Sequence, residues 1–322
     1  VRADLRDPFS MQYNLTLEHQ RWKTGFRLSY IGTNTRQGQY GYNINQPLPD
    51  NRLYVDKPRR FPTYPGITYI TNGAGHQYHS MTVEVERKMA RGLYYQFSYV
   101  LARDIGDLDR GASPENAYDR QRERAVWLDI PTHRPTANFL YELPFGKGRS
   151  YLASAGRTLN TLVGGWEFSG IYSFYSGQFL TPQWTGTDPT GTAFTGSRTP
   201  AQVTIRPNHL RDANLATSER SPSRWFDAGA FAPPTPGFYG SAAKGVIKSP
   251  GSAVWNFGVA KYFPVAERLK LRWELTATNA WNHPNYENPA TNISSATQVG
   301  VISGVGDVSV LDPSGPRSFR MS

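Results

Sequence analysis

The sequence of 322 residues contains no cysteine and no long apolar run. The first absence excludes disulfide bridges, cysteine-ligated zinc and thiol nucleophiles. The second excludes transmembrane helices, because a helix needs about 20 consecutive apolar residues to cross a bilayer. A mean hydropathy of −0.55 and a hydrophobic content of 38% agree with that exclusion.

A leader and a concentrated basic patch are also missing. Residues 1–10 have neither a basic start nor an apolar core, so no signal peptide is visible. If the protein is exported, we therefore expect this sequence to be a fragment of a longer chain. The net charge is +10, but the basic residues are spread along the chain. A nucleic-acid-binding protein usually gathers them on one face, so we expect no nucleic-acid partner.

Aromatic residues are abundant at 13%, and many of them follow a period of two. Every odd position from Leu93 to Leu101 is a large apolar residue, and the same alternation runs from Leu269 to Ala277. This pattern predicts β-strands with two different faces. Soluble strands usually span about five or six residues, whereas a tilted membrane-crossing strand needs about 9–11. The length of these runs therefore favours a transmembrane barrel.

Nine segments fit this pattern, and the links between them alternate in length. An up-and-down barrel has short periplasmic turns and long extracellular loops. We predict an all-β fold, an antiparallel up-and-down transmembrane β-barrel, with the first and last strands both running toward the periplasm. The strand segments are 11–17, 22–30, 81–85, 93–101, 137–143, 166–174, 255–260, 269–277 and 316–322. The short links are 19–21, 90–92 and 265–268, the intermediate link is 146–164, and the long links are 32–75, 105–131, 177–251 and 283–315.

Five short motifs occur along the second half of the chain in a characteristic order. They are YELPFGKG at 141–148, GGWEFSGI at 164–171, YSG at 175–177, RWFD with AF at 224–231, and TNAWNHPN at 278–285, followed by GPR at 315–317. This order resembles the C-terminal half of TonB-dependent receptors, specifically the subgroup with a carboxypeptidase-regulatory-like domain ahead of the plug. The similarity extends from about Asp7 to the end of the chain.

The resemblance implies a location in the cell outer membrane and a barrel of about 22 strands. Residues 1–322 would be the C-terminal segment of that barrel, and the plug and N-terminal domains would lie upstream. The resemblance also implies contact with outer-membrane lipid, and with the TonB complex through the upstream plug region. The implied function is binding and energised uptake of a scarce solute (oligosaccharide, peptide or metal chelate), with no enzymatic reaction and no cofactor.

Four residues are our candidates for contact with a ligand. Arg272 and Glu274 belong to a row of charges expected to face the lumen, where they could instead pair across strands with Glu84 or Glu86, or hold the plug. Trp184 and Trp225 lie in the longest link, together with Phe231, Phe238 and Tyr239. Such rings could stack on sugars or anchor the loop on itself.

Other constellations are weaker. Acidic residues between Asp104 and Asp119 could bind calcium, but they lack the spacing of a calcium loop. His76 and His79 are three residues apart, so on a strand they would point to opposite faces and could not easily share a metal. The strand carboxylates Glu142 and Glu167 fit a polar lumen better than a glycosidase pair.

Three rival hypotheses remain at this stage. A soluble extracellular carbohydrate-binding or adhesive β-protein would bury the apolar faces against a second sheet. A porin-like barrel would have no plug upstream. The same barrel could also use its long loops for protein contacts.

Overall fold

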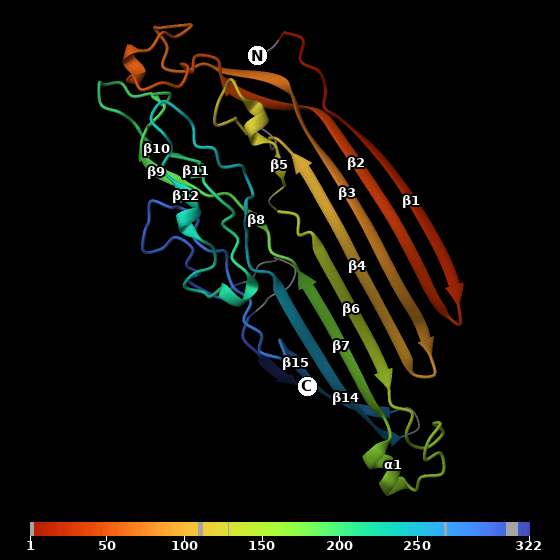
Figure 1. The fold of residues 1–322 in the computed structure, drawn as a ribbon. Coiled ribbons are helices and arrows are strands. Elements are labelled where there is room, and N and C mark those ends of the chain that lie inside the picture. The colour runs from red at the N-terminus through yellow and green to blue at the C-terminus, as the bar shows by residue number, and fades with distance from the viewer. Residues whose placement is uncertain (1–2, 109–111, 128, 267–268, 307–314) are drawn as a thin grey trace.

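The computed structural model describes residues 3–108, 112–127, 129–266, 269–306 and 315–322. A single antiparallel sheet dominates it, in which strands that follow one another along the chain lie side by side (Figure 1). The order in the sheet is β1 (Phe9–Arg21), β2 (Thr24–Asn43), β3 (Thr68–Ala90), β4 (Leu93–Gly106), β6 (His133–Glu142), β7 (Trp166–Tyr175), β14 (Ser252–Ala266), β15 (Leu269–Thr278) and β16 (Ser318–Met321). The short β5 (Ala125–Val126) pairs with the end of β4. These nine sequential strands confirm the predicted up-and-down arrangement, and the sheet is curved but not closed.

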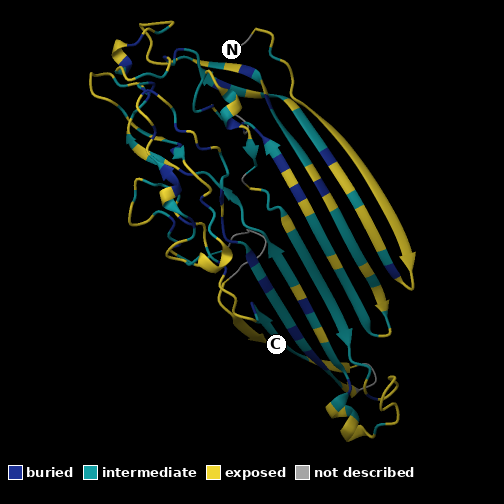
Figure 2. Ribbon diagram, in the orientation of Figure 1, coloured by how far each residue is buried: buried dark blue, intermediate teal, exposed yellow. Residues whose placement is uncertain are grey.

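One face of the sheet is apolar, and we call it the apolar face. Leu15 lies opposite Tyr30, Tyr30 opposite Met81, and Met81 opposite Leu101. Directly opposed residues project to the same side of a sheet, so the row crosses four strands. It continues at the other edge, where Leu275 faces Met321. These side chains cover no other layer of the protein, and the band is exposed along β1 (Figure 2).

The other face, the polar face, is lined by hydroxyl and charged groups. The hydroxyls of Thr16 and Ser29 share a hydrogen bond of 3.1 Å. One register step away, Arg27 lies between two carboxylates, at 2.7 Å from Glu18 and 3.1 Å from Glu84. Period two in the sequence therefore separates an apolar surface from a hydrated one.

Tight turns close one end of the sheet, which we call the short-link end. Trp22 and Lys23 join β1 to β2 with φ angles of 50° and 65°. Arg91 and Gly92 join β3 to β4 with φ angles of 53° and 78°. Positive φ at both central residues matches the right-handed twist of the flanking strands. The third link at this end contains the helix α1 (Arg157–Val163), which the sequence analysis did not predict.

The predicted boundaries of the first long link were wrong. β2 has 20 residues and β3 has 23, so the two strands continue through most of the segment 32–75. Only residues 44–67 connect them, apart from the short 3-10 helix η1 (Tyr54–Asp56). The polar composition of the extended part concealed it, because strands that rise above a membrane need no lipid-facing side chains.

The described residues of the four long links (44–67, 107–132, 176–251 and 279–317) form a compact assembly, which we call the loop cap (Figure 1). Its own core consists of buried apolar side chains of Ala213, Phe226, Ala230, Phe231 and Ile247. In the described residues, no helix has the length and apolar character needed to cross a membrane. The two-stranded pairs of the cap are β8 (Phe179–Leu180) with β13 (Ile247–Lys248), β9 (Trp184–Thr187) with β10 (Gln202–Ile205), and β11 (Asn208–His209) with β12 (Phe231–Ala232), and its 3-10 helices are η1, η2 (Arg120–Glu123), η3 (Thr217–Glu219) and η4 (Ala228–Ala230).

Candidate functional site

The charged row on β15 lies on the polar face near the short-link end. Nη2 of Arg272 is 3.7 Å from Oε1 of Glu167 on β7, and its Nη1 contacts Glu274 on the same strand. Glu167 lies directly opposite Glu142, whose carboxylate is 2.8 Å from Nη2 of Arg149. Two arginines therefore pair with a cluster of three carboxylates.

The expected partners of Arg272 were wrong. Four strands separate β3, which carries Glu84 and Glu86, from β15 in the sheet. Glu84 instead pairs with Arg27 on the neighbouring β2. The pairing across strands that was expected does occur, but between other strands.

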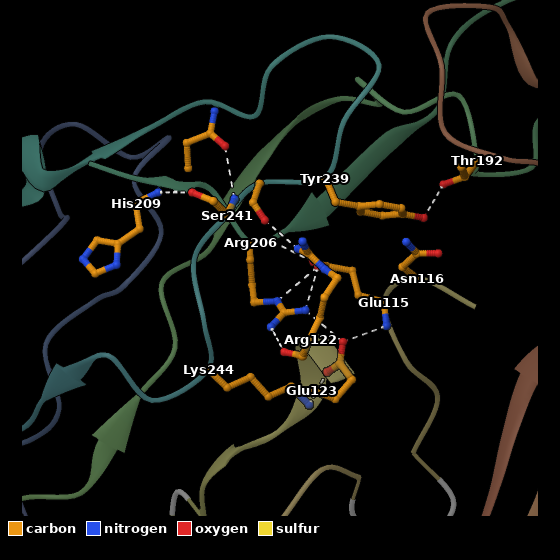
Figure 3. A network of polar contacts seen from close by, with 12 residues as sticks. Glu115, Asn116, Arg122, Glu123, Thr192, Arg206, His209, Tyr239, Ser241 and Lys244 are labelled. Carbon is orange, nitrogen blue, oxygen red and sulfur yellow. Dashed lines mark hydrogen bonds and ion pairs between the residues drawn. The ribbon is translucent and has the colours of Figure 1, made fainter. Parts of the chain in front are cut away.

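The loop cap is held together by a buried ionic network (Figure 3). Arg206 donates to Glu123 at 2.8 Å and to Glu115 at 3.1 Å, and only 4% of Arg206 and 2% of Glu123 are exposed. Arg122 and Lys244 contact the same two carboxylates. The acidic residues come from the link 107–132, whereas Arg206 and Lys244 come from 176–251. The network therefore joins two links that are remote in sequence.

A buried lysine joins a third link to the cap. The side chain of Lys57 is fully buried, and its Nζ donates to the carbonyls of Leu48 at 2.8 Å and of Thr190. The same Nζ lies 3.1 Å from Oδ1 of Asp50. Side-chain hydrogen bonds from Arg52, with a further one from Lys57, hold the pKa of the Asp50 carboxyl well below its usual range.

A cavity of about 730 Å³ opens between this cap and the upper parts of β2 and β3. His76 stands on the same side of β3 as Glu84, so the cavity adjoins the polar face. Nδ1 of His76 is 3.0 Å from Oδ2 of Asp104, and the rings of His76 and Trp127 pack edge to face with their centres 5.0 Å apart. The lining residues are Pro8, Thr35, Gly38, Gln39, Tyr40, Gly41, Thr68, Ile70, Ala74, Gly75, His76, Leu108, Ser113 and Trp127.

The four predicted ligand contacts do not form one site. Arg272 and Glu274 lie at the short-link end, whereas both tryptophans belong to the loop cap. Trp184 stands on β9, and its ring covers the backbone of Gly186. Trp225 donates from Nε1 to the carbonyl of Lys248 at 2.8 Å and lines a second cleft.

Several loop aromatics anchor the cap on itself. Phe231 is buried against Phe226, and Tyr239 shares a 2.8 Å hydrogen bond with Thr192. Burial raises the pKa of Tyr239 to about 12. Phe238 is exposed.

The acidic stretch has other partners than a metal ion. Asp107 accepts a hydrogen bond from the backbone of Gly75 and pairs with Arg120, while Glu115 contacts Arg206. Asp109 lies outside the described residues. Among those that are described, no group of three histidine or acidic side chains is arranged to hold a metal ion.

The cavity could not be predicted from local patterns, because its lining comes from four separated segments, near 8, 35–41, 68–76 and 108–127. The burial of Lys57 and Arg206 was not predicted either. Both are basic residues in polar links, and nothing in their neighbours signals burial.

A family model described as "Outer membrane beta barrel domain" matches residues 1–318. The chain belongs to this family. As an outer membrane β-barrel, it resides in the cell outer membrane, and its apolar face contacts lipid. The long-link end then faces the outside of the cell and the polar face forms the lumen wall. A comparison with curated proteins found no match.

Two solved structures are similar to this barrel segment. One is the outer membrane transporter YddB from Escherichia coli, with a TM-score of 0.49 and 11% identity over 99% of this chain and 32% of that one. The other is FpvA of P. aeruginosa bound to heterologous pyoverdines, with a TM-score of 0.41 and 9% identity over 99% of this chain and 31% of FpvA. The present chain spans about a third of the length of each.

Proposed function

We propose that this chain is the C-terminal barrel wall of a TonB-dependent receptor that binds a scarce solute at its outer end and takes it up. The observation that carries the proposal is the cavity under the loop cap. Its volume of about 730 Å³ lies within the range of about 300–1,000 Å³ usual for small-molecule sites. It adjoins the lumen side of the wall, where a solute on its way inward would pass.

The cavity lining suggests what part of a solute it would receive. Tyr40, Ile70, Leu108 and Trp127 supply apolar surface, and no described lysine, arginine, aspartate or glutamate belongs to the lining. Rings and hydroxyls with few charges favour an uncharged group, such as a sugar or an aromatic ring. An oligosaccharide, a peptide and a metal chelate can each present such a group.

The locked loop cap supports a binding role in a second way. Lys57 and Arg206 fix three links against one another before any ligand arrives. A preformed site loses less conformational freedom on binding, which increases affinity.

The upstream regions are part of the same proposal. A plug would fill the lumen, and the carboxypeptidase-regulatory-like subgroup would add a domain ahead of it. Arg272, with its carboxylate partners at the lower end of the lumen wall, would face such a plug. The row could also contact the solute as it passes.

The test uses the full-length receptor in cells with and without the energy-coupling protein. Accumulation of labelled neutral oligosaccharides, linear peptides and ferric chelates is measured for the wild type, for Trp127→Ala and for Trp184→Ala. We expect one solute class to accumulate only with coupling, and Trp127→Ala to weaken its binding about tenfold, as for the loss of a stacked ring with its buried area. Trp184→Ala is the matched control, because that ring lies outside the cavity lining.

Two results would contradict the proposal. Passive swelling of liposomes that contain the full-length protein, in sugars of graded size, would indicate an open porin. The second contradicting result is energy-coupled uptake that is unchanged in Trp127→Ala but lost in Trp184→Ala. It would show that the solute binds outside this cavity.

A further inference from the structure

A second cleft, of about 770 Å³, lies where the loop cap meets the ends of β4, β6, β7 and β14. Among its lining residues, Arg103 is opposite His79 in the sheet, His133 is opposite Leu101, and Phe174 is opposite Ala253. These pairs continue the row of Leu101 and Met81, which is the apolar, lipid-facing row. The strand part of the cleft therefore faces outward.

Two pairs of amphipathic rings on the same face indicate where the cleft lies relative to the membrane boundary. The hydroxyl of Tyr30 shares a 2.8 Å hydrogen bond with His79, and that of Tyr99 shares a 2.7 Å bond with His133. Rings with one apolar and one polar end settle at the boundary between lipid tails and headgroups. His133 belongs both to this belt and to the cleft. The cleft thus begins at the headgroup level of the outer leaflet.

The cleft is strongly cationic. Arg103, Arg220 and Lys248 line it together with His133 and His283, and the described residues contribute no aspartate or glutamate to its lining. Arg103 and Lys248 are exposed residues, and neither has a carboxylate within ion-pair distance among the described residues, although the charge of Lys248 acts on the carboxyl of Asp212. The arginines and the lysine buried in the loop cap, by contrast, meet carboxylates. The cations of this cleft can therefore meet an anion that arrives from the membrane.

Trp225 and the backbone around it position the side chain of Arg220. Trp225 donates to the carbonyl of Lys248, and the guanidinium carbon of Arg220 lies 5.5 Å from the centre of the Trp225 ring. Nε of Arg220 donates to the carbonyl of Leu215 at 2.9 Å, which orients the remaining nitrogens. Tyr286 packs beside Trp225 and adds a second ring to the same wall.

We propose that this cleft binds the phosphorylated headgroup of a glycolipid of the outer leaflet. The arginine guanidinium groups match phosphate oxygens in a two-pronged geometry, and the lysine adds a point charge. Trp225 and Tyr286 offer faces for the sugar to which the phosphate is attached. The acyl chains would descend along the apolar face past Leu101, which continues the cleft into the membrane. The occupant is a lipid and not the transported solute, because the strand part of the cleft lies outside the lumen. This proposal rests on the outer-membrane location alone and does not depend on the proposed uptake.

The test is native mass spectrometry of the detergent-purified full-length receptor titrated with bisphosphorylated lipid A. The variant carries Arg103→Gln, Arg220→Gln and Lys248→Gln together. We expect its affinity for lipid A to fall at least about tenfold, since each lost contact is a charge-assisted hydrogen bond. Arg198→Gln is the matched control, because it removes a cation from the same link outside the cleft. Heat-modifiable migration on a gel verifies that each protein is folded.

Two further arms identify the source of the phosphate. Lipid A without its phosphates should bind the wild type and the triple variant equally weakly. Millimolar inorganic phosphate should displace intact lipid A from the wild type only weakly. The proposal is overturned if the triple variant binds lipid A as the wild type does, or if dephosphorylated lipid A binds equally well. Displacement by inorganic phosphate at an affinity equal to that of lipid A would also overturn it, because the cleft would then be a site for free anions.

Discussion

Nη2 of Arg206 lies 2.8 Å from Oε1 of Glu123, a residue that precedes it by 83 positions, and both side chains are almost fully buried. This contact turns two long loops into one body. An ion pair removed from water is stable only when its hydrogen bonds are satisfied. Here further ion pairs with Glu115, Arg122 and Lys244 surround the two side chains (Figure 3).

Removal of one partner should therefore loosen the loop cap without affecting the barrel. Arg206→Ala leaves Glu123 with less compensation in a buried site, at a cost of about 3–5 kcal/mol to the stability of the cap. Limited proteolysis of the full-length protein should show faster cleavage within 107–132 and 176–251, with unchanged heat-modifiability. Arg198→Ala breaks a pair with Asp56 in which the arginine is 76% exposed, and should cost about 0–1 kcal/mol. Equal cleavage in the two variants would show that the network does not hold the cap.

The contacts that hold the link 44–67 to the rest of the loop cap should weaken at acid pH. The pKa of the Asp50 carboxyl is depressed, mainly by Arg52, so its charged form is favoured in the folded state. Its contribution is complete above the unfolded pKa of about 3.9 and disappears as the pH falls below that value toward the folded pKa. The protection of residues 44–67 against hydrogen exchange, corrected for the intrinsic pH dependence of amide exchange, should decrease at the acid end of a series from pH 7 to pH 3. Asp50→Asn should exchange faster at neutral pH and lose that acid dependence, and an unchanged profile would refute the assignment.

The phenol of Tyr239 should ionise at a pH well above the usual range of a tyrosine. Burial raises the pKa of Tyr239 to about 12, so the folded state favours the neutral phenol. The stabilisation is present below the unfolded pKa of about 10 and is lost as the pH rises from there to about 12. Difference absorbance of the phenolate between wild type and Tyr239→Phe should show one group that ionises near pH 12. A Tyr239 signal at pH 10 would mean that the ring is hydrated.

Two glycines on the lipid-facing side are covered by aromatic rings from the next strand. A Cβ at Gly170 would lie 2.3 Å from the ring of Phe139, and one at Gly32 would lie 2.3 Å from Tyr13. Gly170→Val should displace Phe139 and destabilise the full-length barrel by about 1–3 kcal/mol, as overpacking does. Urea unfolding in detergent, followed by gel migration, measures the change. Gly25→Ala is the control, since its nearest neighbour would be 3.9 Å away. Equal midpoints for the two variants would contradict this packing argument.

The sequence by itself determined the wall of this protein. Each strand has one face toward lipid and the other toward the lumen. Apolar and polar residues therefore alternate along the strand, as from Leu269 to Ala277. The alternating link lengths added the up-and-down order. Both features depend on neighbours in sequence, and the sheet confirms the nine strands.

The tertiary structure decided everything that depends on residues remote from one another. Arg272 finds Glu167 and not Glu84, because the order of strands in the sheet sets which charges meet. The cavity beside Trp127 and the cleft beside Arg103 each combine strands with links from elsewhere in the chain. Lys57 and Arg206 look like ordinary loop cations in the sequence. Only the folded loop cap removes them from water, because burial is a property of the assembled surface and not of the local pattern.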